Sequence, residues 1–85
     1  MPPPTPAQLG TVIRQAREAH NLSIETLAEK AGISWRYLSK IERGRKRTNP
    51  TWIVLGGIAG ALGMEISELA KRAEGLAAGQ STKRS

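Results

Sequence analysis

Two short helical patterns follow each other in this sequence with only a tight turn between them, and this tandem restricts the possible fold more than any other feature. The first begins after Ser23, a residue type that caps helix amino ends, and ends at Gly32, which readily adopts the left-handed backbone found beyond helix ends. The second begins after Ser34 and is predicted to run through about Arg43, where Gly44 stops it. The sequence therefore predicts two short helices joined by a glycine-containing turn.

This tandem is a helix-turn-helix pattern, and one further helix is predicted before it and two after it. The first spans residues 6–19, because Thr5 opens a capping box and apolar residues then recur every three or four positions. The fourth is capped by either Asn49 or Thr51, and the fifth covers about residues 66–73. The residues of the fourth helix predicted to face the core are Trp52, Leu55, Ile58, Ala59 and Leu62. No segment alternates apolar and polar residues as a half-buried strand does, so we predict an all-α, compact five-helix domain.

The chain is predicted to form one domain between two unstructured segments. Residues 1–5 are proline-rich and are expected to be disordered. Residues 6–74 hold the helices, whereas residues 75–85 lack a regular apolar stripe and are expected to form a flexible basic tail. A chain of 85 residues is long enough for one thin hydrophobic core without covalent cross-links.

The residue types that the chain lacks exclude several kinds of chemistry. The sequence has no cysteine and one histidine, so neither a disulfide framework nor a metal site is predicted. The serines and lysines form no recognisable nucleophile–base unit, so we expect no catalytic residues, no cofactor and no enzymatic activity. The amino end does not resemble a signal peptide, and the longest uncharged run, residues 48–64, holds too few apolar residues to cross a bilayer. We therefore expect a cytoplasmic protein with no membrane partner.

The net charge of +6 is concentrated in one segment of the chain. Residues 36–47 carry six basic residues and one acidic residue, so this segment supplies +5 of the total. Such an excess attracts polyanions, of which nucleic acid is the commonest and an acidic membrane surface is the main competitor. Runs of charge are also often just solvated surface, so the arrangement of these residues on their helix must distinguish the two interpretations.

The third helix separates its charged residues from its apolar residues. At about 100° per residue, Leu38 and Ile41 fall on one face of the helix. The opposite face contains no acidic residue and carries Arg36, Ser39, Lys40 and Arg43. A solvated helix usually mixes both signs of charge, so this uniformly cationic face favours nucleic-acid binding. A helix of this width fits the major groove of DNA, where arginine and lysine can contact guanine and serine can contact several bases.

A set of short motifs lies along residues 7–73: "LA" at 27–28, "AGIS" at 31–34, "YLSKIERG" at 37–44, "ALG" at 61–63 and "SELA" at 67–70. Together these motifs resemble the phage repressor and Cro-like (XRE-type) helix-turn-helix family. The resemblance implies a lambda repressor-like DNA-binding fold that binds double-stranded DNA as a two-fold homodimer, with the helix at residues 34–43 in the major groove. The operator that such a dimer binds would be palindromic.

The resemblance also implies roles for individual residues. The positions that contact bases in this family correspond to Trp35, Arg36, Tyr37, Ser39 and Lys40. The positions that contact DNA phosphates correspond to Ser23, Arg43, Arg45, Lys46 and Arg47. An arginine late in the first helix commonly pairs with the glutamate of "IERG", which implies a structural salt bridge between Arg17 and Glu42.

Two positions depart from the family's pattern. The residue after the cap of the second helix is often a phosphate-binding glutamine, but here it is Ile24. Ser23 and nearby backbone N–H groups at the helix amino end would then make that contact. The first recognition position is Trp35, whose indole offers one hydrogen-bond donor and no acceptor. Trp35 would contact a thymine methyl group, the sugar-phosphate backbone or a second protein, or it would pack against the second helix and contact no base.

These observations predict a sequence-specific transcription regulator, and in particular a repressor. One alternative is the DNA-binding antitoxin of a toxin–antitoxin pair, or another partner subunit of a regulatory complex. The segment after residue 75 is short and poor in bulky apolar residues, which argues against it. A third class is an RNA-binding or co-activator adaptor that has the same fold. A regulator of the predicted type is expected in the cytoplasm with the nucleoid, and a phage or plasmid could encode it.

Overall fold

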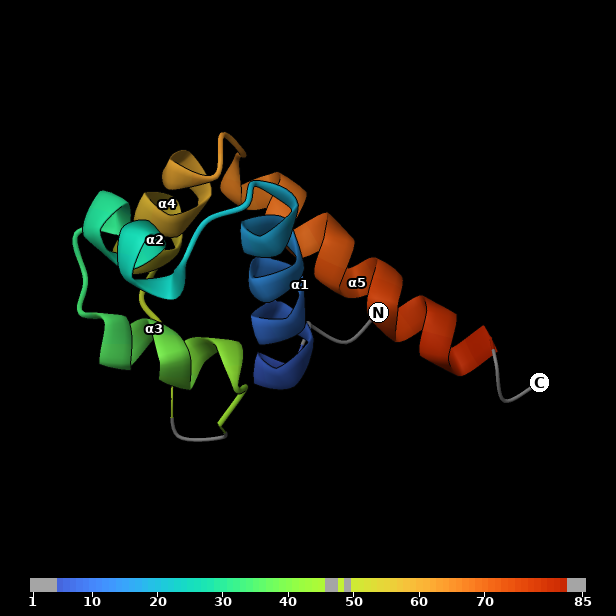
Figure 1. Ribbon diagram of the computed structural model, residues 1–85. Helices are drawn as coiled ribbons and strands as arrows, with labels where there is room; N and C mark the ends of the chain where they lie inside the picture. Colours follow the sequence, from blue (N-terminus) through green and yellow to red (C-terminus); the bar gives the residue numbers. More distant parts are fainter. Residues whose placement is uncertain (1–4, 46–47, 49, 83–85) are drawn as a thin grey trace.

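The computed structural model describes residues 5–45, 48 and 50–82, and from residue 76 onward it describes the backbone alone. Within these residues the chain forms five α-helices and no strand, as Figure 1 shows. The helices are α1 (Pro6–Ala19), α2 (Ile24–Ala31), α3 (Trp35–Glu42), α4 (Trp52–Ala61) and α5 (Ile66–Thr82). The prediction of an all-α, five-helix fold is confirmed.

The first three helices begin where their capping residues predict. Thr5 and Gln8 form a capping box: the Gln8 N–H donates to Thr5 Oγ1 at 3.2 Å, and the Thr5 N–H donates to Gln8 Oε1 at 2.8 Å. Ser23 and Ser34 cap α2 and α3, because each hydroxyl accepts a hydrogen bond from the backbone N–H three residues later. These bonds satisfy donors that would otherwise have no partner within the helix.

The turn between α2 and α3 depends on one left-handed residue. Gly32 has φ of 75°, a conformation that costs glycine little because it has no Cβ. The Ile33 N–H then returns to the Ala28 carbonyl at 3.0 Å, which closes the end of α2. Ser34 caps α3 in the next position, so α2 and α3 are joined by three residues, Gly32, Ile33 and Ser34.

The start of α4 was predicted at either of two caps, and the structure shows one of them. The Thr51 hydroxyl accepts a hydrogen bond from the Val54 N–H at 3.2 Å, which makes Thr51 the cap. The other candidate, Asn49, lies outside the described residues.

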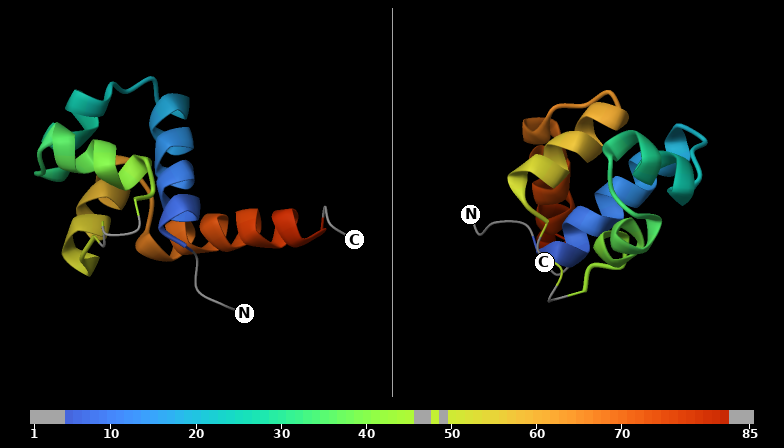
Figure 2. Two further views of the ribbon diagram at one scale, coloured as in Figure 1. Left: turned by 90° about the horizontal axis from the view of Figure 1, so that it is seen from below. Right: turned by 90° about the vertical axis from the view of Figure 1, so that its left-hand side faces the viewer.

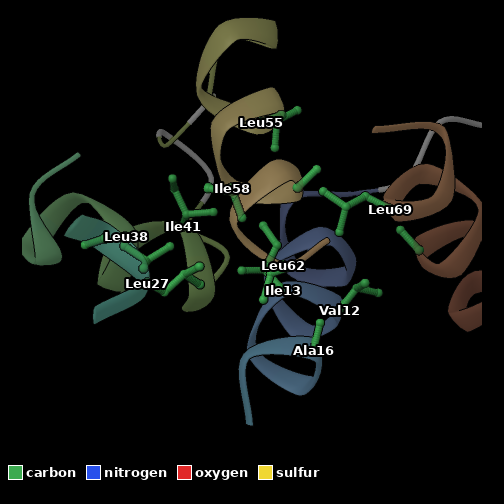
Figure 3. Close-up of a cluster of buried hydrophobic side chains, with 13 residues drawn as sticks. Val12, Ile13, Ala16, Leu27, Leu38, Ile41, Leu55, Ile58, Leu62 and Leu69 are labelled. Carbon is green, nitrogen blue, oxygen red and sulfur yellow. The ribbon is translucent and has the colours of Figure 1, made fainter. Parts of the chain in front are cut away.

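One hydrophobic core joins all five helices (Figure 3). Helix α1 packs against α3 on one side and α5 on another, while α2 packs against α3 and α4. The largest fully buried side chains are Ile13, Leu27, Leu38, Ile58 and Leu69, one from each helix. The position of α3 is therefore set by the burial of its apolar face against α1 and α2.

The prediction that Trp52 belongs to the core is wrong. Its side chain is 69% exposed, and the next residue, Ile53, is 87% exposed. Both residues lie in the first turn of α4. One turn further along, Leu55 is buried but is the most exposed member of the core, so the core ends within this turn. The spacing of Trp52 fits the apolar stripe, but no other helix covers the end of α4 at that point.

The last helix is longer than the sequence analysis predicts. Helix α5 continues to Thr82, whereas the apolar stripe predicts an end at about Ala73 and a flexible segment from Gly75. Ala73 is the last buried residue among those whose side chains are described, and beyond it α5 extends away from the other helices (Figures 1 and 2). The following residues include leucine and alanine, which favour helix without any core contact. The predicted end of the helix is therefore wrong, while the division of the chain at residue 74 stays a prediction.

No single helix among the described residues is long and apolar enough to cross a membrane. Helix α4 and the first part of α5 pass that test of length and composition only when taken together. They are bent by 91° at the break between them.

Candidate nucleic-acid interface

Helix α3 presents its cationic face to solvent. Leu38 and Ile41 are buried, and this fixes the rotation of the helix about its axis. Arg36, Lys40 and Arg43 lie on the other side of the helix and are exposed. In Figure 1 α3 lies at the lower edge of the molecule, on the opposite side of α1 from most of α5. A partner can therefore approach this face without any rearrangement of the other helices.

The exposed side chains of α3 and of the following loop surround a shallow pocket of about 270 Å³. It is lined by Trp35, Arg36, Ser39, Lys40, Arg43 and Arg45. Four of these six residues are cations and none is acidic, so the potential in the pocket favours an anionic partner. Four of the five predicted base contacts and two of the predicted phosphate contacts thus line one pocket.

Trp35 and Arg36 form a cation–π pair at the start of α3. The Arg36 guanidinium carbon lies 5.5 Å from the centre of the Trp35 ring, within the range of this interaction. Trp35 remains 49% exposed. The ring therefore restricts where the Arg36 guanidinium can point and still leaves part of its own surface for a partner.

The other two predicted base contacts, Tyr37 and Ser39, are less accessible. Both side chains are half-buried, and the Tyr37 ring packs against the hydrophobic core. Ser39 lines the pocket, so its hydroxyl lies beside the cations of the same face. The predicted roles of these two residues in reading bases stay predictions, and the packing of Tyr37 favours a mainly structural role for its ring.

The predicted phosphate contacts fall into three groups. Arg43 and Arg45 are exposed and line the pocket, whereas Lys46 and Arg47 lie outside the described residues. Ser23 is exposed, but its hydroxyl donates to Thr26 Oγ1 at 2.8 Å and accepts from the Thr26 N–H at 3.1 Å. Its hydroxyl proton is therefore already engaged, and only the backbone at the amino end of α2 would be left to donate to a phosphate. The acidic Glu25 in the first turn of α2 opposes such a contact.

Arg17 and Glu42 form a two-pronged ion pair that joins the end of α1 to the end of α3. Arg17 Nε lies 2.8 Å from Glu42 Oε2, and Arg17 Nη2 lies 3.1 Å from Glu42 Oε1. The remaining nitrogen, Nη1, donates to the Leu22 carbonyl at 2.8 Å. The side chains are 15% and 6% exposed, so neither is available to a partner. The pair fixes the angle of α3 rather than contacting a ligand.

This ion pair also shifts the pKa of Arg17. The hydrogen bonds that Arg17 donates to Glu42 raise the pKa of Arg17 above its ordinary value, although burial acts in the opposite direction.

Two glycines position α3 in a way that was not predicted from the sequence. A Cβ on Gly10 would lie 2.7 Å from the carbonyl oxygen of Glu42 and closer still to that of Ile41. A Cβ on Gly44 would overlap the backbone of Ala7, and Gly44 has φ of 66°. Both glycines allow the carboxyl end of α3 to lie directly against α1. The signal in the sequence was a glycine inside the amphipathic helix 6–19, which weakens a helix unless close packing requires it.

Comparison with known proteins agrees with this arrangement. A helix-turn-helix family model matches residues 13–72. The HTH-type transcriptional regulator SlrR of Bacillus subtilis is 43% identical over 61 residues, which are 72% of this chain and 40% of SlrR. The chain thus spans about two fifths of the length of this curated relative.

Solved structures are similar over most of the fold. The clp gene regulator ClgR from Corynebacterium glutamicum superposes with a TM-score of 0.86 and is 31% identical, over 98% of this chain and 87% of that one. SinR, a master regulator for biofilm formation solved in complex with DNA, superposes with a TM-score of 0.66 and is 38% identical, over 72% of this chain and 95% of that one.

Proposed function

This chain belongs to the phage repressor and Cro-like (XRE-type) helix-turn-helix family, and from that premise we propose that it is a sequence-specific, DNA-binding transcription regulator. One observation carries the proposal. The exposed face of α3 is uniformly cationic, and it lies opposite the two residues, Leu38 and Ile41, that anchor the helix in the core. Such a helix can enter the major groove of DNA without exposing any apolar core residue.

Within this proposal, Arg36 and Lys40 read base edges. Both side chains project from the exposed face of α3, and Arg or Lys pairs best with the O6 and N7 acceptors of guanine. Trp35 positions the Arg36 guanidinium through the cation–π contact and makes apolar contact with the DNA. Trp35 therefore contributes to specificity mainly by restricting Arg36.

Arg43 and Arg45 contact the phosphate backbone beside the groove. Both are exposed at or just beyond the end of α3, where a charged side chain reaches the edge of the groove rather than its floor. Each phosphate that is neutralised releases about one condensed counterion, so the affinity would fall as the salt concentration rises. Lys46 and Arg47 would extend the same contact.

The regulator binds its operator as a two-fold homodimer and acts as a repressor. Each copy places one α3 helix in the major groove, and two half-sites about 10 bp apart lie on the same side of the duplex. Occupation of the groove by two copies excludes other proteins from that stretch of DNA. A palindromic operator overlapping a promoter would thereby be silenced.

The experiment that tests this function compares Arg36→Ala with Arg45→Ala on the duplex sequence that the wild-type protein selects from a random pool. Arg36→Ala is expected to lose about 1–3 kcal/mol on the selected duplex and much less on a scrambled one, because a base contact carries sequence preference. Arg45→Ala is expected to weaken binding to both duplexes equally and to reduce the salt dependence by about one counterion. Fluorescence anisotropy titrations at several salt concentrations measure both effects.

Lys71→Ala is the matched control, because it removes one exposed cation from α5, which packs against α1 and α4. It should leave the preference for the selected duplex unchanged. If Arg36→Ala weakens selected and scrambled duplexes alike, Arg36 does not read a base. If the wild-type protein selects no sequence at all, the proposed function itself is wrong.

A further inference from the structure

The amino end of α4 exposes two large apolar side chains that no part of the described structure covers. Trp52 and Ile53 are 69% and 87% exposed. Helix α4 contains no charged residue in any of its turns, and it is the only helix of the described chain with that property. Exposed aromatic and aliphatic residues side by side are typical of surfaces that bind another protein.

The same side of α4 carries a glycine that packing inside the domain does not explain. At about 100° per residue, Ile53, Gly56 and Gly60 lie on one side of the helix. A Cβ on Gly57 would approach the Ala31 carbonyl oxygen to 2.9 Å, so this glycine is required for the packing of α4 on α2. A Cβ on Gly60 would meet nothing within 4 Å, and Gly60 is exposed.

Gly60 lies within α4, one residue before its end, and a helical glycine lowers the stability of a helix relative to alanine. No neighbouring atom within the domain requires a glycine at position 60. The lack of a side chain there would, however, let the backbone of a second chain approach α4 closely. Gly56 lies one turn before it, with only Ile66 Cδ1 near its would-be Cβ, at 3.4 Å. These two glycines leave α4 without side chains on the side where Ile53 is exposed.

We infer that the surface formed by Trp52, Ile53, Gly56 and Gly60, called here the α4 face, is where a second copy of this chain docks. This inference names the interface of the homodimer and rests on the proposed function for the need of one. A two-fold interface must be self-complementary, so each feature has to fit its own symmetry mate. On the α4 face, Ile53 of each copy would lie over the small residues of the other.

Charge favours a second copy as the occupant of this face. The chain carries a net charge of +6, so two copies repel each other least when they meet through a surface without cations. The α4 face is such a surface, whereas the α3 face, with its three exposed cations, is not. The lack of any cation on the α4 face also disfavours nucleic acid as its occupant.

The position of α4 fits the same arrangement. Figure 2 (left) shows the molecule of Figure 1 from below, which is the side where α3 lies. In this view the beginning of α4 lies at the edge of the molecule beside α3. Suppose that a second copy docks there, related by a two-fold axis parallel to the viewing direction of Figure 2 (left). Its α3 would then face the viewer as the first copy's α3 does. Both recognition helices would then face one DNA duplex, as a two-fold site requires.

Ile53→Glu tests the inference. The substitution places one carboxylate from each copy in the same apolar contact, so the dissociation constant of the dimer is expected to rise at least about tenfold. The fold should be retained, because Ile53 is exposed and an acidic residue in the first turn of a helix is favourable. Sedimentation equilibrium measures the dimer without DNA, and circular dichroism verifies the fold. Gln15→Glu makes the same change of charge at an exposed position of α1 and should leave the dimer intact.

Gly60→Leu is a second, independent variant. It adds a bulky side chain at a position where a Cβ meets nothing within 4 Å, and leucine favours helix over glycine, so the monomer should melt at the same or a higher temperature. The dimer should nevertheless weaken, because the two helices can no longer approach closely. A variant that is more stable as a monomer and less able to associate is difficult to explain by misfolding.

DNA binding separates the failure of this inference from the failure of the proposed function. Ile53→Glu should bind a duplex carrying one half-site as the wild type does, and lose affinity only on the complete site. If Ile53→Glu and Gly60→Leu dimerise with the same dissociation constant as the wild type, the α4 face is not the interface, even if DNA binding is normal. If the wild type dimerises but binds no duplex, and Ile53→Glu weakens that dimer, the proposed function is wrong and the α4 face remains the interface.

Discussion

Gly10→Ala is expected to lower the free energy of unfolding by about 3 kcal/mol, because the added methyl group overlaps backbone atoms that cannot move aside easily. Those atoms are the carbonyl oxygens of Ile41 and Glu42, at the end of α3. Alanine favours helix over glycine by about 1 kcal/mol, so propensity alone predicts a change of the opposite sign. Chemical denaturation of the purified variant, followed by circular dichroism, measures the difference.

Gly75→Ala is the matched control for Gly10→Ala. It makes the same substitution inside α5, at a position where the new Cβ meets nothing within 4 Å. This variant should be as stable as the wild type or slightly more stable. If Gly10→Ala were equally neutral, α1 and α3 would not be in the close contact that sets the angle of α3.

The weakened packing should also affect DNA binding. Helix α3 can relieve the overlap at Gly10 only by moving away from α1, and this movement displaces Arg36 and Lys40 relative to the rest of the interface. The folded fraction of Gly10→Ala is therefore expected to bind the selected duplex more weakly than the wild type does. Titrations at low temperature, where the variant remains folded, separate this effect from unfolding.

Glu42→Ala is expected to destabilise the protein by about 2–3 kcal/mol, somewhat less than breaking a completely buried pair. The substitution leaves the Arg17 guanidinium, which is only 15% exposed, without its two-pronged partner. One hydrogen bond, from Arg17 Nη1 to the Leu22 carbonyl, would remain. Thermal and denaturant melts of the variant measure the loss.

The Arg72–Glu68 pair provides the control for Glu42→Ala. Its nitrogen–oxygen distance of 2.9 Å is similar, but both side chains are about half exposed. Glu68→Ala should therefore cost less than about 0.5 kcal/mol, as exposed pairs one helical turn apart do. A Glu42→Ala protein that keeps full stability but no longer binds DNA would contradict the structural role and place Glu42 in the interface itself.

Much of the fold could be predicted because local chemistry determines it. Thr5, Ser23 and Ser34 cap helices through bonds that span only three residues, so the sequence alone locates those helix starts. The choice between the two caps of α4 required the structure. The rotation of α3 could also be predicted, because Leu38 and Ile41 are the only large aliphatic residues on that short helix.

The wrong or missing predictions concern features that depend on contacts between segments distant in the sequence, or on helix that forms without an apolar stripe. Trp52 has the spacing of a core residue, but whether anything covers it depends on where α4 ends relative to its neighbours. The length of α5 was underestimated because the prediction relied on a regular apolar stripe, which the sequence after Gly75 lacks. Gly10 and Gly44 are ordinary glycines until α3 is placed against α1. The salt bridge between Arg17 and Glu42 was anticipated only through the family resemblance, since no local pattern joins residues 25 positions apart.

Methylation interference on the selected duplex tests most directly whether α3 reads the major groove. Guanine N7 lies in the major groove and adenine N3 in the minor groove, so the two methylated positions report on different faces of the DNA. We expect guanine N7 methylation to block binding in two clusters about 10 bp apart, and adenine N3 methylation between them to have little effect. Interference confined to adenine N3, or no interference at guanine N7 in either half-site, would contradict the placement of α3 in the major groove.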